Sequence, residues 1–220
     1  MSRGGSGGRT RVKTARGRTA QSVRWLERQL NDPYVKKAKA AGYRSRAAYK
    51  LIELDERFAF LKGAKRIIDL GIAPGGWSQV AGKACPGARI VGIDLLPTDP
   101  IENVIIAEMD FMADTAPAWL EEQLEGKADL VLSDMAANTV GHQQTDHLRT
   151  MGLVEAAVDF AVQVLRPGGH FVAKSLAGGS DSTLVGTLKA NFTTVKHAKP
   201  PASRSGSSEW YVVAMGFKGG

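Results

Sequence analysis

Residues 66–77 read RIIDLGIAPGGW, a short apolar run that leads into a glycine-rich turn. The run has the length and composition of a buried strand, and a helix is expected to begin near Trp77. A strand, a glycine-rich turn and a helix in this order form the first unit of an α/β sheet whose turn binds a nucleotide cofactor. The stretch therefore predicts both the fold class and the position of a cofactor loop.

The glycine spacing of this loop distinguishes between two kinds of cofactor. Gly71, Ala73 and Gly76 nearly fit the dinucleotide fingerprint, and Asp94 closes the next strand about where a ribose-binding acid is expected. In a dinucleotide site the middle residue is glycine, because the pyrophosphate approaches the backbone there. The Cβ of Ala73 and the adjacent Pro74 hinder that approach, whereas a nucleoside cofactor without phosphates needs only the tight turn and the acid. S-Adenosylmethionine therefore fits the loop better than NAD.

Outward from the loop, short apolar runs alternate with helical stretches. This alternation predicts a doubly wound, Rossmann-like α/β fold with a mostly parallel sheet and helices on both faces. The helix that contains Met151 and Val158 is expected to end at the Arg-Pro-Gly-Gly turn of residues 166–169. The expected strands are residues 66–70, 89–94, 104–109, 129–133, 171–174, 193–197 and 210–215.

Three helices are expected before the first strand. Residues 22–30 and 33–41 form short basic helices, and residues 45–58 form a longer one for which Ser45 is the expected N-cap. Apolar residues at helical spacing give the longer helix one face that packs on a core. The other face, which the pattern places in solvent, carries Arg46, Lys50, Glu53 and Arg57.

Composition indicates a polyanionic partner. The 220 residues carry a formal net charge of +7 and a pI near 9.6, and a basic surface gains affinity for phosphates through counterion release. The single cysteine, Cys85, excludes an internal disulfide framework, and no apolar run approaches the ~20 residues of a membrane span. The histidines, such as His142 and His147, lack metal-ligand spacing, so no metal is expected. We expect a cytoplasmic protein that binds nucleic acid.

The amino terminus has a different composition from the rest of the chain. Residues 1–25 contain seven arginines and lysines, and no acid precedes Glu27. We expect residues 1–21 to be a disordered basic arm that touches RNA phosphates, followed by a single domain over residues 22–220. A mitochondrial transit peptide is an alternative, although the glycines break an amphipathic helix, and a solvated tail without a role is another.

Acidic residues end three successive strands of the predicted sheet. Asp94, Asp110 and Asp134 would meet in one crevice, because open parallel sheets bind ligands outside the carboxyl ends of their strands. Asp110 is placed to accept a hydrogen bond from the amino group of an adenine. Lys174 ends another strand, where a buried ammonium needs a partner. An ion pair with Asp134 would provide one, and a purely structural pair is the alternative to a catalytic one.

Six segments together resemble the FtsJ/RrmJ-type ribose 2′-O-methyltransferases. They are SRAAYKLIELDE, DLGIAPGGWSQ, DLLPTDPI, SDMAANTVG, RPGGHFVAKSL and KPPASRSGSSEWYVVAMG, in the order typical of the family. The match runs from Ser45 to the end of the chain, and six segments in order are far more specific than one glycine loop. The resemblance implies a methyltransferase sheet that is mostly parallel with an antiparallel last strand.

The resemblance also implies the site residues. The catalytic Lys-Asp-Lys-Glu tetrad of the family falls on Lys50, Asp134, Lys174 and Glu209, and the S-adenosylmethionine site falls on Gly75, Trp77, Asp94, Asp110 and Asp134. The roles of Lys50 and Glu209 rest on the resemblance alone. The chain departs from the family pattern at Ile72, at Ala137 and in the SLAGG stretch after Lys174, where RNA would approach.

The implied reaction is methylation of the ribose 2′-hydroxyl of a uridine in large-subunit (23S) ribosomal RNA, in the peptidyl-transferase A-loop. We expect a monomer that acts on this RNA within the large subunit or its late precursor. A methyltransferase of the tRNA anticodon loop is an alternative within the family. A ribosome-assembly factor that binds RNA without catalysis is an alternative of another class, and the intact tetrad argues against it. An NAD-dependent oxidoreductase is disfavoured by Ala73 and Pro74.

Overall fold

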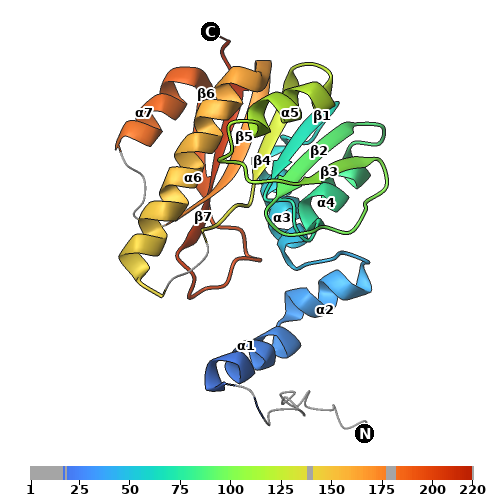
Figure 1. The fold of residues 1–220 in the computed structure, drawn as a ribbon, viewed down its shortest axis with the longest axis vertical. Helices are drawn as coiled ribbons and strands as arrows, with labels where there is room; N and C mark the ends of the chain where they lie inside the picture. The colour runs from blue at the N-terminus through green and yellow to red at the C-terminus, as the bar shows by residue number, and fades with distance from the viewer. Residues whose placement is uncertain (1–16, 18, 138–140, 177–181, 220) are drawn as a thin grey trace, which may run out of the picture.

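The computed structural model describes residues 17, 19–137, 141–176 and 182–219. They form a seven-stranded sheet with helices on both faces (Figure 1). The strands are β1 (Arg66–Leu70), β2 (Arg89–Asp94), β3 (Val104–Glu108), β4 (Ala128–Ser133), β5 (Leu165–Leu176), β6 (Phe192–Ala198) and β7 (Glu209–Phe217). The helices are α1 (Ala20–Asn31), α2 (Pro33–Ala40), α3 (Ala47–Phe58), α4 (Gly76–Ala84), α5 (Ala116–Leu124), α6 (Gln143–Val164) and α7 (Ser182–Asn191).

The strand order places the crevice of the sheet between β1 and β4. The order is β3-β2-β1-β4-β5-β7-β6, and β7 runs antiparallel to both of its neighbours while the other pairs are parallel. The strands β2 and β3 follow β1 on one side of the sheet, and the strands after β4 are added on the other side. A ligand site is expected at such a switch point. The predicted fold, with a mostly parallel sheet and an antiparallel last strand, is confirmed.

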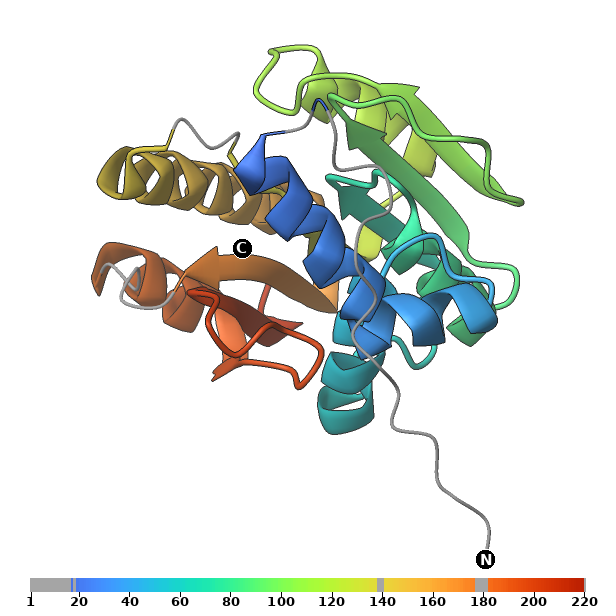
Figure 2. The same cartoon turned by 90° about the horizontal axis from the view of Figure 1, so that it is seen from below.

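The two faces of the sheet carry different helices. Alternate residues of each strand point to opposite faces, so in β1 Ile68 and Leu70 face α5, α6 and α7, whereas Ile67 faces α3 and α4. The helices α1 and α2 lie beyond one end of this layered body (Figures 1 and 2). Asp32 caps α2 by accepting a hydrogen bond from the Tyr34 backbone N–H at 3.0 Å, with Pro33 at the first helical position.

Two local predictions are wrong. Ser45 does not cap α3, which begins at Ala47, because the Ser45 hydroxyl is buried where α3 packs against Gly76 at the start of α4. The helix α6 ends at Val164, immediately before this segment as predicted, but residues 166–169 do not form a turn outside the sheet. Leu165 already pairs with Ala128, so the Pro-Gly-Gly segment is an irregular part of β5, where the register with β4 shifts.

The predicted basic arm falls almost entirely outside the described residues. Within the described part, α1 begins at Ala20, inside the predicted arm, and the Thr19 hydroxyl caps it by accepting a hydrogen bond from the Ser22 backbone N–H. The boundary between an arm and a single domain stays a prediction. None of the helices in the described part of the chain is long and apolar enough to cross a membrane.

Candidate active site

The loop that connects β1 to α4 is shaped by two glycines. Gly71 has φ +80° and its missing Cβ makes room for Met135, while Gly75 has φ +107° and a Cβ there would collide with Ile101. Both conformations are ones that glycine adopts without strain. The backbone N–H of Ala73 donates to Asp94 Oδ2 at 2.9 Å, so the loop is tied to the end of β2.

A cavity of about 210 Å³ opens beside this loop, at the carboxyl ends of β1, β2 and β4. Its wall contains Gly71 and the predicted cofactor acids Asp94, Asp110 and Asp134. Apolar side chains complete the wall: Ile93, Leu95, Leu96, Met109, Phe111, Met135 and Leu153. An apolar cleft with a few convergent carboxylates suits a nucleoside, whose base has apolar faces and whose ribose hydroxyls donate hydrogen bonds.

The two acids that end β2 and follow β3 are already held by the backbone. Asp94 Oδ1 accepts from the Leu96 N–H at 2.9 Å, and Asp110 Oδ1 accepts from the Met112 N–H at 2.9 Å. Each contact is of the kind by which aspartate forms turns. These bonds fix the orientation of both carboxylates toward the cavity.

Gly75 and Trp77 are not part of this cavity wall. Trp77 is 3 % exposed, its indole N–H donates to the Ala47 carbonyl at 2.9 Å, and its ring lies 5.7 Å from the Tyr211 ring. The Trp77 side chain therefore joins α4 to α3 and the sheet. The cofactor roles of Gly75 and Trp77 stay predictions.

Lys174 and Asp134 form the predicted ion pair. The Lys174 ammonium lies 3.0 Å from Asp134 Oδ1 and donates to the Asp134 backbone carbonyl at 2.7 Å. The two side chains are only 13 % and 17 % exposed. The Tyr211 hydroxyl donates to the same Oδ1 at 2.9 Å. The carboxylate thus receives two hydrogen bonds on one oxygen.

These contacts set the ionisation of Asp134 and Tyr211. Burial disfavours the charged form of Asp134, but the charges of Lys174 and Lys50 and the hydrogen bonds from Lys174 and Tyr211 outweigh it and lower the pKa of this carboxyl. Burial and the neighbouring acids Asp134 and Glu209 raise the pKa of Tyr211 well above its ordinary value. Asp134 is therefore ionised and Tyr211 a proton donor at neutral pH.

A second ion pair lies beside the first. Lys50 Nζ lies 2.8 Å from Glu209 Oε2, and its ammonium is 5.7 Å from the centre of the Tyr211 ring. The prediction of a solvated helix face is wrong for Lys50, which is 7 % exposed, because the chain before β7 covers this part of α3. Glu209 is the first residue of β7. The four residues assigned to the tetrad therefore occupy one region, linked by Tyr211.

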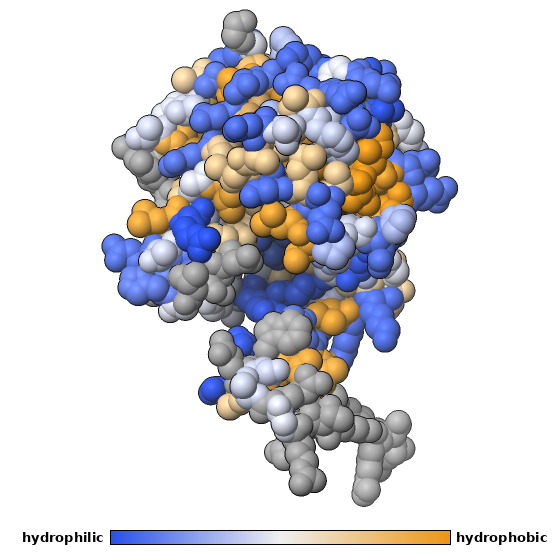
Figure 3. Space-filling view, in the orientation of Figure 1, coloured by the Kyte–Doolittle hydropathy of each residue, from blue (hydrophilic) through white to orange (hydrophobic). Residues whose placement is uncertain are grey.

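A larger cavity of about 650 Å³ meets the smaller one at this cluster. Lys174 and Glu209 line the larger cavity, Asp134 lines the smaller one, and Ala136 borders both. Figure 3 shows a hollow in this face of the molecule, with hydrophilic residues around its lower part. A ligand in the small cavity and a macromolecule at the large one would meet at Lys174 and Asp134.

Sequence reasoning missed three residues of this region. Tyr211 pairs directly with Lys174 across β5 and β7, and its position two residues after Glu209 in a strand was a signal that the two share a face. Arg44 donates to the carbonyls of Pro74, Asp99 and Pro100, which joins the cofactor loop to the loop after β2. No pattern in the sequence indicates that pairing.

The third missed residue is Asp69, the fourth of the five residues of β1. It is fully buried, and its Oδ2 accepts from the Ser78 hydroxyl at 2.7 Å. Burial, opposed by that hydrogen bond and assisted by the charges of Asp134 and Asp94, raises the pKa of Asp69 to about 7. The sequence signal that could have found Asp69 is a charged side chain within the apolar run of residues 66–70, where burial needs a partner.

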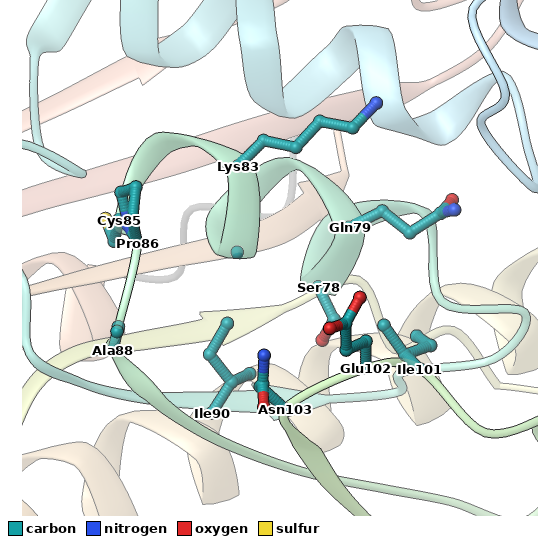
Figure 4. A pocket seen from close by; sticks show the side chains of 12 residues that line it. Ser78, Gln79, Lys83, Cys85, Pro86, Ala88, Ile90, Ile101, Glu102 and Asn103 are labelled. Atoms are coloured by element: carbon teal, nitrogen blue, oxygen red, sulfur yellow. The ribbon is translucent and has the colours of Figure 1, made fainter.

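Another cavity, of about 370 Å³, lies between α4, β2 and the residues that precede β3 (Figure 4). Its wall mixes Cys85, Ile90 and Ile101 with Gln79 and Glu102, and none of the predicted site residues lines it. Among the described residues, no group of three or more His, Cys, Asp or Glu could hold a metal ion. The candidate site is therefore the paired cavities at the end of β1 and β4.

Comparison with known proteins agrees with this geometry. Residues 43–217 match the FtsJ-like methyltransferase family. The chain belongs to the FtsJ-like methyltransferase family. Membership confirms the predicted enzyme class, a methyltransferase that uses S-adenosylmethionine, and the family recognised in the sequence.

Individual FtsJ-like relatives cover nearly the whole chain. A ribosomal RNA large subunit methyltransferase E from Rhizorhabdus wittichii is 74% identical, over 100% of this chain and 96% of its own. A protein of the same name from Paramagnetospirillum magneticum is 60% identical, over 95% of this chain and 88% of its own.

Solved structures give the same family and fold. A chain described as a ribosomal RNA methyltransferase from Plasmodium falciparum is 35% identical, with a TM-score of 0.71 over 81% of this chain and 100% of its own. The N-methyltransferase NodS from Bradyrhizobium japonicum, in complex with S-adenosyl-L-homocysteine, is 17% identical, with a TM-score of 0.51 over 88% of this chain and 97% of its own. The NodS likeness shows the fold alone.

Proposed function

We propose that this chain transfers a methyl group from S-adenosylmethionine to the ribose 2′-hydroxyl of a uridine in large-subunit (23S) ribosomal RNA, in the peptidyl-transferase A-loop. The observation that carries the proposal is the Lys174–Asp134 pair at the junction of the two cavities. The names of the relatives, which are ribosomal RNA large subunit methyltransferases, favour this substrate over the tRNA anticodon loop.

The smaller cavity would hold the methyl donor. Asp94 and Asp110 would accept hydrogen bonds from the ribose hydroxyls and the adenine amino group, and Asp134 would lie beside the methyl-bearing end. Arg44 keeps the loop in place by joining its Pro74 carbonyl to Asp99 and Pro100. When bound, S-adenosylmethionine supplies an electrophilic methyl group on a sulfonium. The protein side of the reaction is then to hold the target oxygen in line with that group.

Lys174 would act on the target hydroxyl from the larger cavity. The side-chain nitrogen of Lys174 contacts Asp134 in two directions, through the carboxylate and through the backbone carbonyl. In the third direction, a lone pair on this nitrogen would face the 2′-hydroxyl. The lone pair would accept the hydroxyl proton while the new O–C bond forms and the S–C bond breaks. The competing role is a charged ammonium that orients the hydroxyl and stabilises the developing alkoxide.

Lys50 and Glu209 would complete the network from the opposite side. Their ion pair lies against the Tyr211 ring, whose hydroxyl reaches Asp134. A change in charge at any one of the four tetrad residues would therefore alter the electrostatic environment of the other three. We also propose that the enzyme acts as a monomer in the cytoplasm, on RNA within the large subunit or its late precursor, with its basic residues on the phosphates.

The test uses the full-length protein, labelled S-adenosylmethionine and three substrates: free large-subunit RNA, isolated large subunits from a strain without the gene, and total tRNA. Incorporation into the large-subunit RNA, with mass analysis that locates one 2′-O-methyluridine in the A-loop, is the expected result. Methylation of tRNA alone would favour the anticodon-loop alternative. Binding to subunits without incorporation into any of the three would favour an assembly factor.

A further inference from the structure

The loop between β6 and β7, residues 199–208, packs against the polar face of α3. Glu53 Oε2 accepts a hydrogen bond from the Ala202 backbone N–H at 2.6 Å, and the Arg46 guanidinium donates to the Ala202 carbonyl at 2.6 Å. Ala202 itself is fully buried. Because both polar groups of this residue are bound, one to Glu53 of α3 and one to Arg46 at the N-cap of α3, the backbone that leads into Ser203 has a fixed position.

Ser203 uses that position to reach the second ion pair. Its side chain is buried, with the residue 6 % exposed, and its hydroxyl donates to Glu209 Oε1 at 2.8 Å. Lys50 occupies the other carboxylate oxygen, Oε2, at 2.8 Å. Hydrogen bonds to a carboxylate are about twice as strong as those between neutral groups. The two bonds together set the rotation of the carboxylate.

Glu53, the residue of α3 that binds the Ala202 backbone, is itself held by a hydrogen bond from α2. The Tyr34 hydroxyl donates to Glu53 Oε1 at 2.7 Å, so both oxygens of the Glu53 carboxylate are occupied. Burial, followed by the hydrogen bond and charge of Glu53, raises the pKa of Tyr34 to about 12. Tyr34 therefore remains a donor throughout the pH range of an activity assay.

We propose that Ser203 is a positioning residue for methyl transfer: it orients the Glu209 carboxylate toward Lys50, and Glu53 fixes the backbone from which it does so. The proposal rests on the proposed function, in that Lys50 and Glu209 take part in the reaction. It assigns a catalytic consequence to a serine that lines neither of the two cavities. A serine that served only to fold the loop would have no specific coupling to Glu209.

The experiment is a double-mutant cycle between Ser203→Ala and Glu209→Gln, with Ser205→Ala as the control. Ser205 is an exposed serine of the same loop, and within the part of the chain that the structure describes its hydroxyl makes no hydrogen bond. For Ser203→Ala we expect kcat to fall about tenfold, the effect of one charge-assisted hydrogen bond, with the KM for S-adenosylmethionine unchanged. Ser205→Ala should keep the wild-type kcat.

The cycle separates positioning from folding. In the Glu209→Gln background, Ser203→Ala should change kcat less than twofold, because the group that it orients is no longer a carboxylate. An equal loss in both backgrounds, or a wild-type kcat for Ser203→Ala, would overturn the proposal. If Ser203→Ala folds poorly by circular dichroism, Glu53→Gln replaces it in the cycle, with the same two outcomes.

The same measurements distinguish this proposal from the proposed function. If Glu209→Gln lowers kcat about a hundredfold and Ser203→Ala keeps the wild-type kcat, only the positioning role fails. If Glu209→Gln keeps the wild-type rate of RNA methylation, the role of the second ion pair in the reaction fails, and the proposal for Ser203 fails with it.

Discussion

The Lys174 ammonium contacts Asp134 twice, at 2.7 Å through the backbone carbonyl and at 3.0 Å through the carboxylate. The backbone contact ties the lysine to the end of β4. The carboxylate contact also links it to Tyr211, which donates to the same oxygen, and the positive charge of Lys50 acts on the same carboxylate. Substitutions at the two residues should therefore have different consequences. Loss of the lysine removes one chemical group, and loss of the aspartate disturbs a charge cluster.

Replacement of Lys174 by alanine should abolish methyl transfer while cofactor binding persists. The side chain lines the larger cavity and not the smaller one, so the Kd for S-adenosylmethionine by calorimetry should stay within about threefold of wild type. The rate of incorporation into RNA should fall at least about a thousandfold, since the group that would act either as proton acceptor or as charged ammonium is lost. Lys62→Ala, which removes an exposed lysine, is the control for net charge.

Lys174→Arg then separates the two roles of the lysine. Arginine keeps the positive charge but cannot accept a proton near neutral pH. An inactive arginine variant supports proton acceptance, whereas an arginine variant with a substantial rate supports orientation and charge stabilisation. A near-normal rate in Lys174→Ala would remove this residue from the mechanism.

Replacement of Asp134 by alanine should weaken both cofactor binding and stability. Asp134 lines the smaller cavity, so we expect the Kd for S-adenosylmethionine to rise about tenfold, alongside the loss of turnover. The variant also leaves the buried Lys174 ammonium without its carboxylate, which should cost about 3 kcal/mol of unfolding free energy in urea titrations. Unchanged cofactor binding would show that Asp134 serves the lysine alone.

The pH dependence of this stability has a defined sign. Because the pKa of Asp134 is lowered in the folded protein, its contribution is present above the unfolded pKa of about 4 and is lost as the pH falls through the folded value. The difference in stability between wild type and Asp134→Ala should therefore be constant near neutral pH and shrink below about pH 4. A difference that persists undiminished in acid would contradict the ion-pair origin of the effect.

The sequence predicts those parts of the site that sit on the sheet. Asp94, Asp110, Asp134 and Lys174 follow or end strands whose apolar runs are short and well bounded, and parallel strands bring such ends together whatever the loops do. Even the pairing of Lys174 with Asp134 follows from their positions in neighbouring strands. The periodicity of the chain is therefore enough to nominate them.

Residues that depend on the packing of separate elements are beyond such reasoning. Lys50 lies on a helix face that the pattern places in solvent, and it is buried only because the loop around Ala202 folds back over α3. Ser45 has the sequence of an N-cap but lies against α4 instead. In each case the deciding contact joins residues far apart in the chain. The role proposed for Lys50 comes from the family resemblance, which reflects such contacts without requiring them to be derived from the pattern.

Replacement of Trp77 by phenylalanine tests whether its side chain is needed by the cofactor. The structure gives the indole N–H to the Ala47 carbonyl at 2.9 Å and buries the ring beside Tyr211. We expect Trp77→Phe to lose about 1 kcal/mol of unfolding free energy, the value of one buried hydrogen bond, with the Kd for S-adenosylmethionine unchanged. A rise of tenfold or more in that Kd without a loss of stability would assign the indole itself to the cofactor.

Asp69 should make the protein less stable as the pH rises. Its pKa is about 7 in the folded protein and about 4 in the unfolded chain, so between these values the unfolded chain loses the proton while the folded protein keeps it. The folded state is therefore penalised progressively from about pH 4 to about pH 7, and by a constant amount above that.

Asp69→Asn removes the titration while keeping an oxygen that can accept from the Ser78 hydroxyl. We expect the two proteins to unfold at similar urea concentrations at pH 4 and the variant to gain on the order of 2 kcal/mol over wild type at pH 8. Ser78→Ala, which removes the hydrogen bond but leaves the carboxyl, should retain the pH dependence. A stability difference between Asp69→Asn and wild type that is the same at both pH values would show that Asp69 does not titrate in this range, and that its carboxylate is stabilised inside β1 despite complete burial.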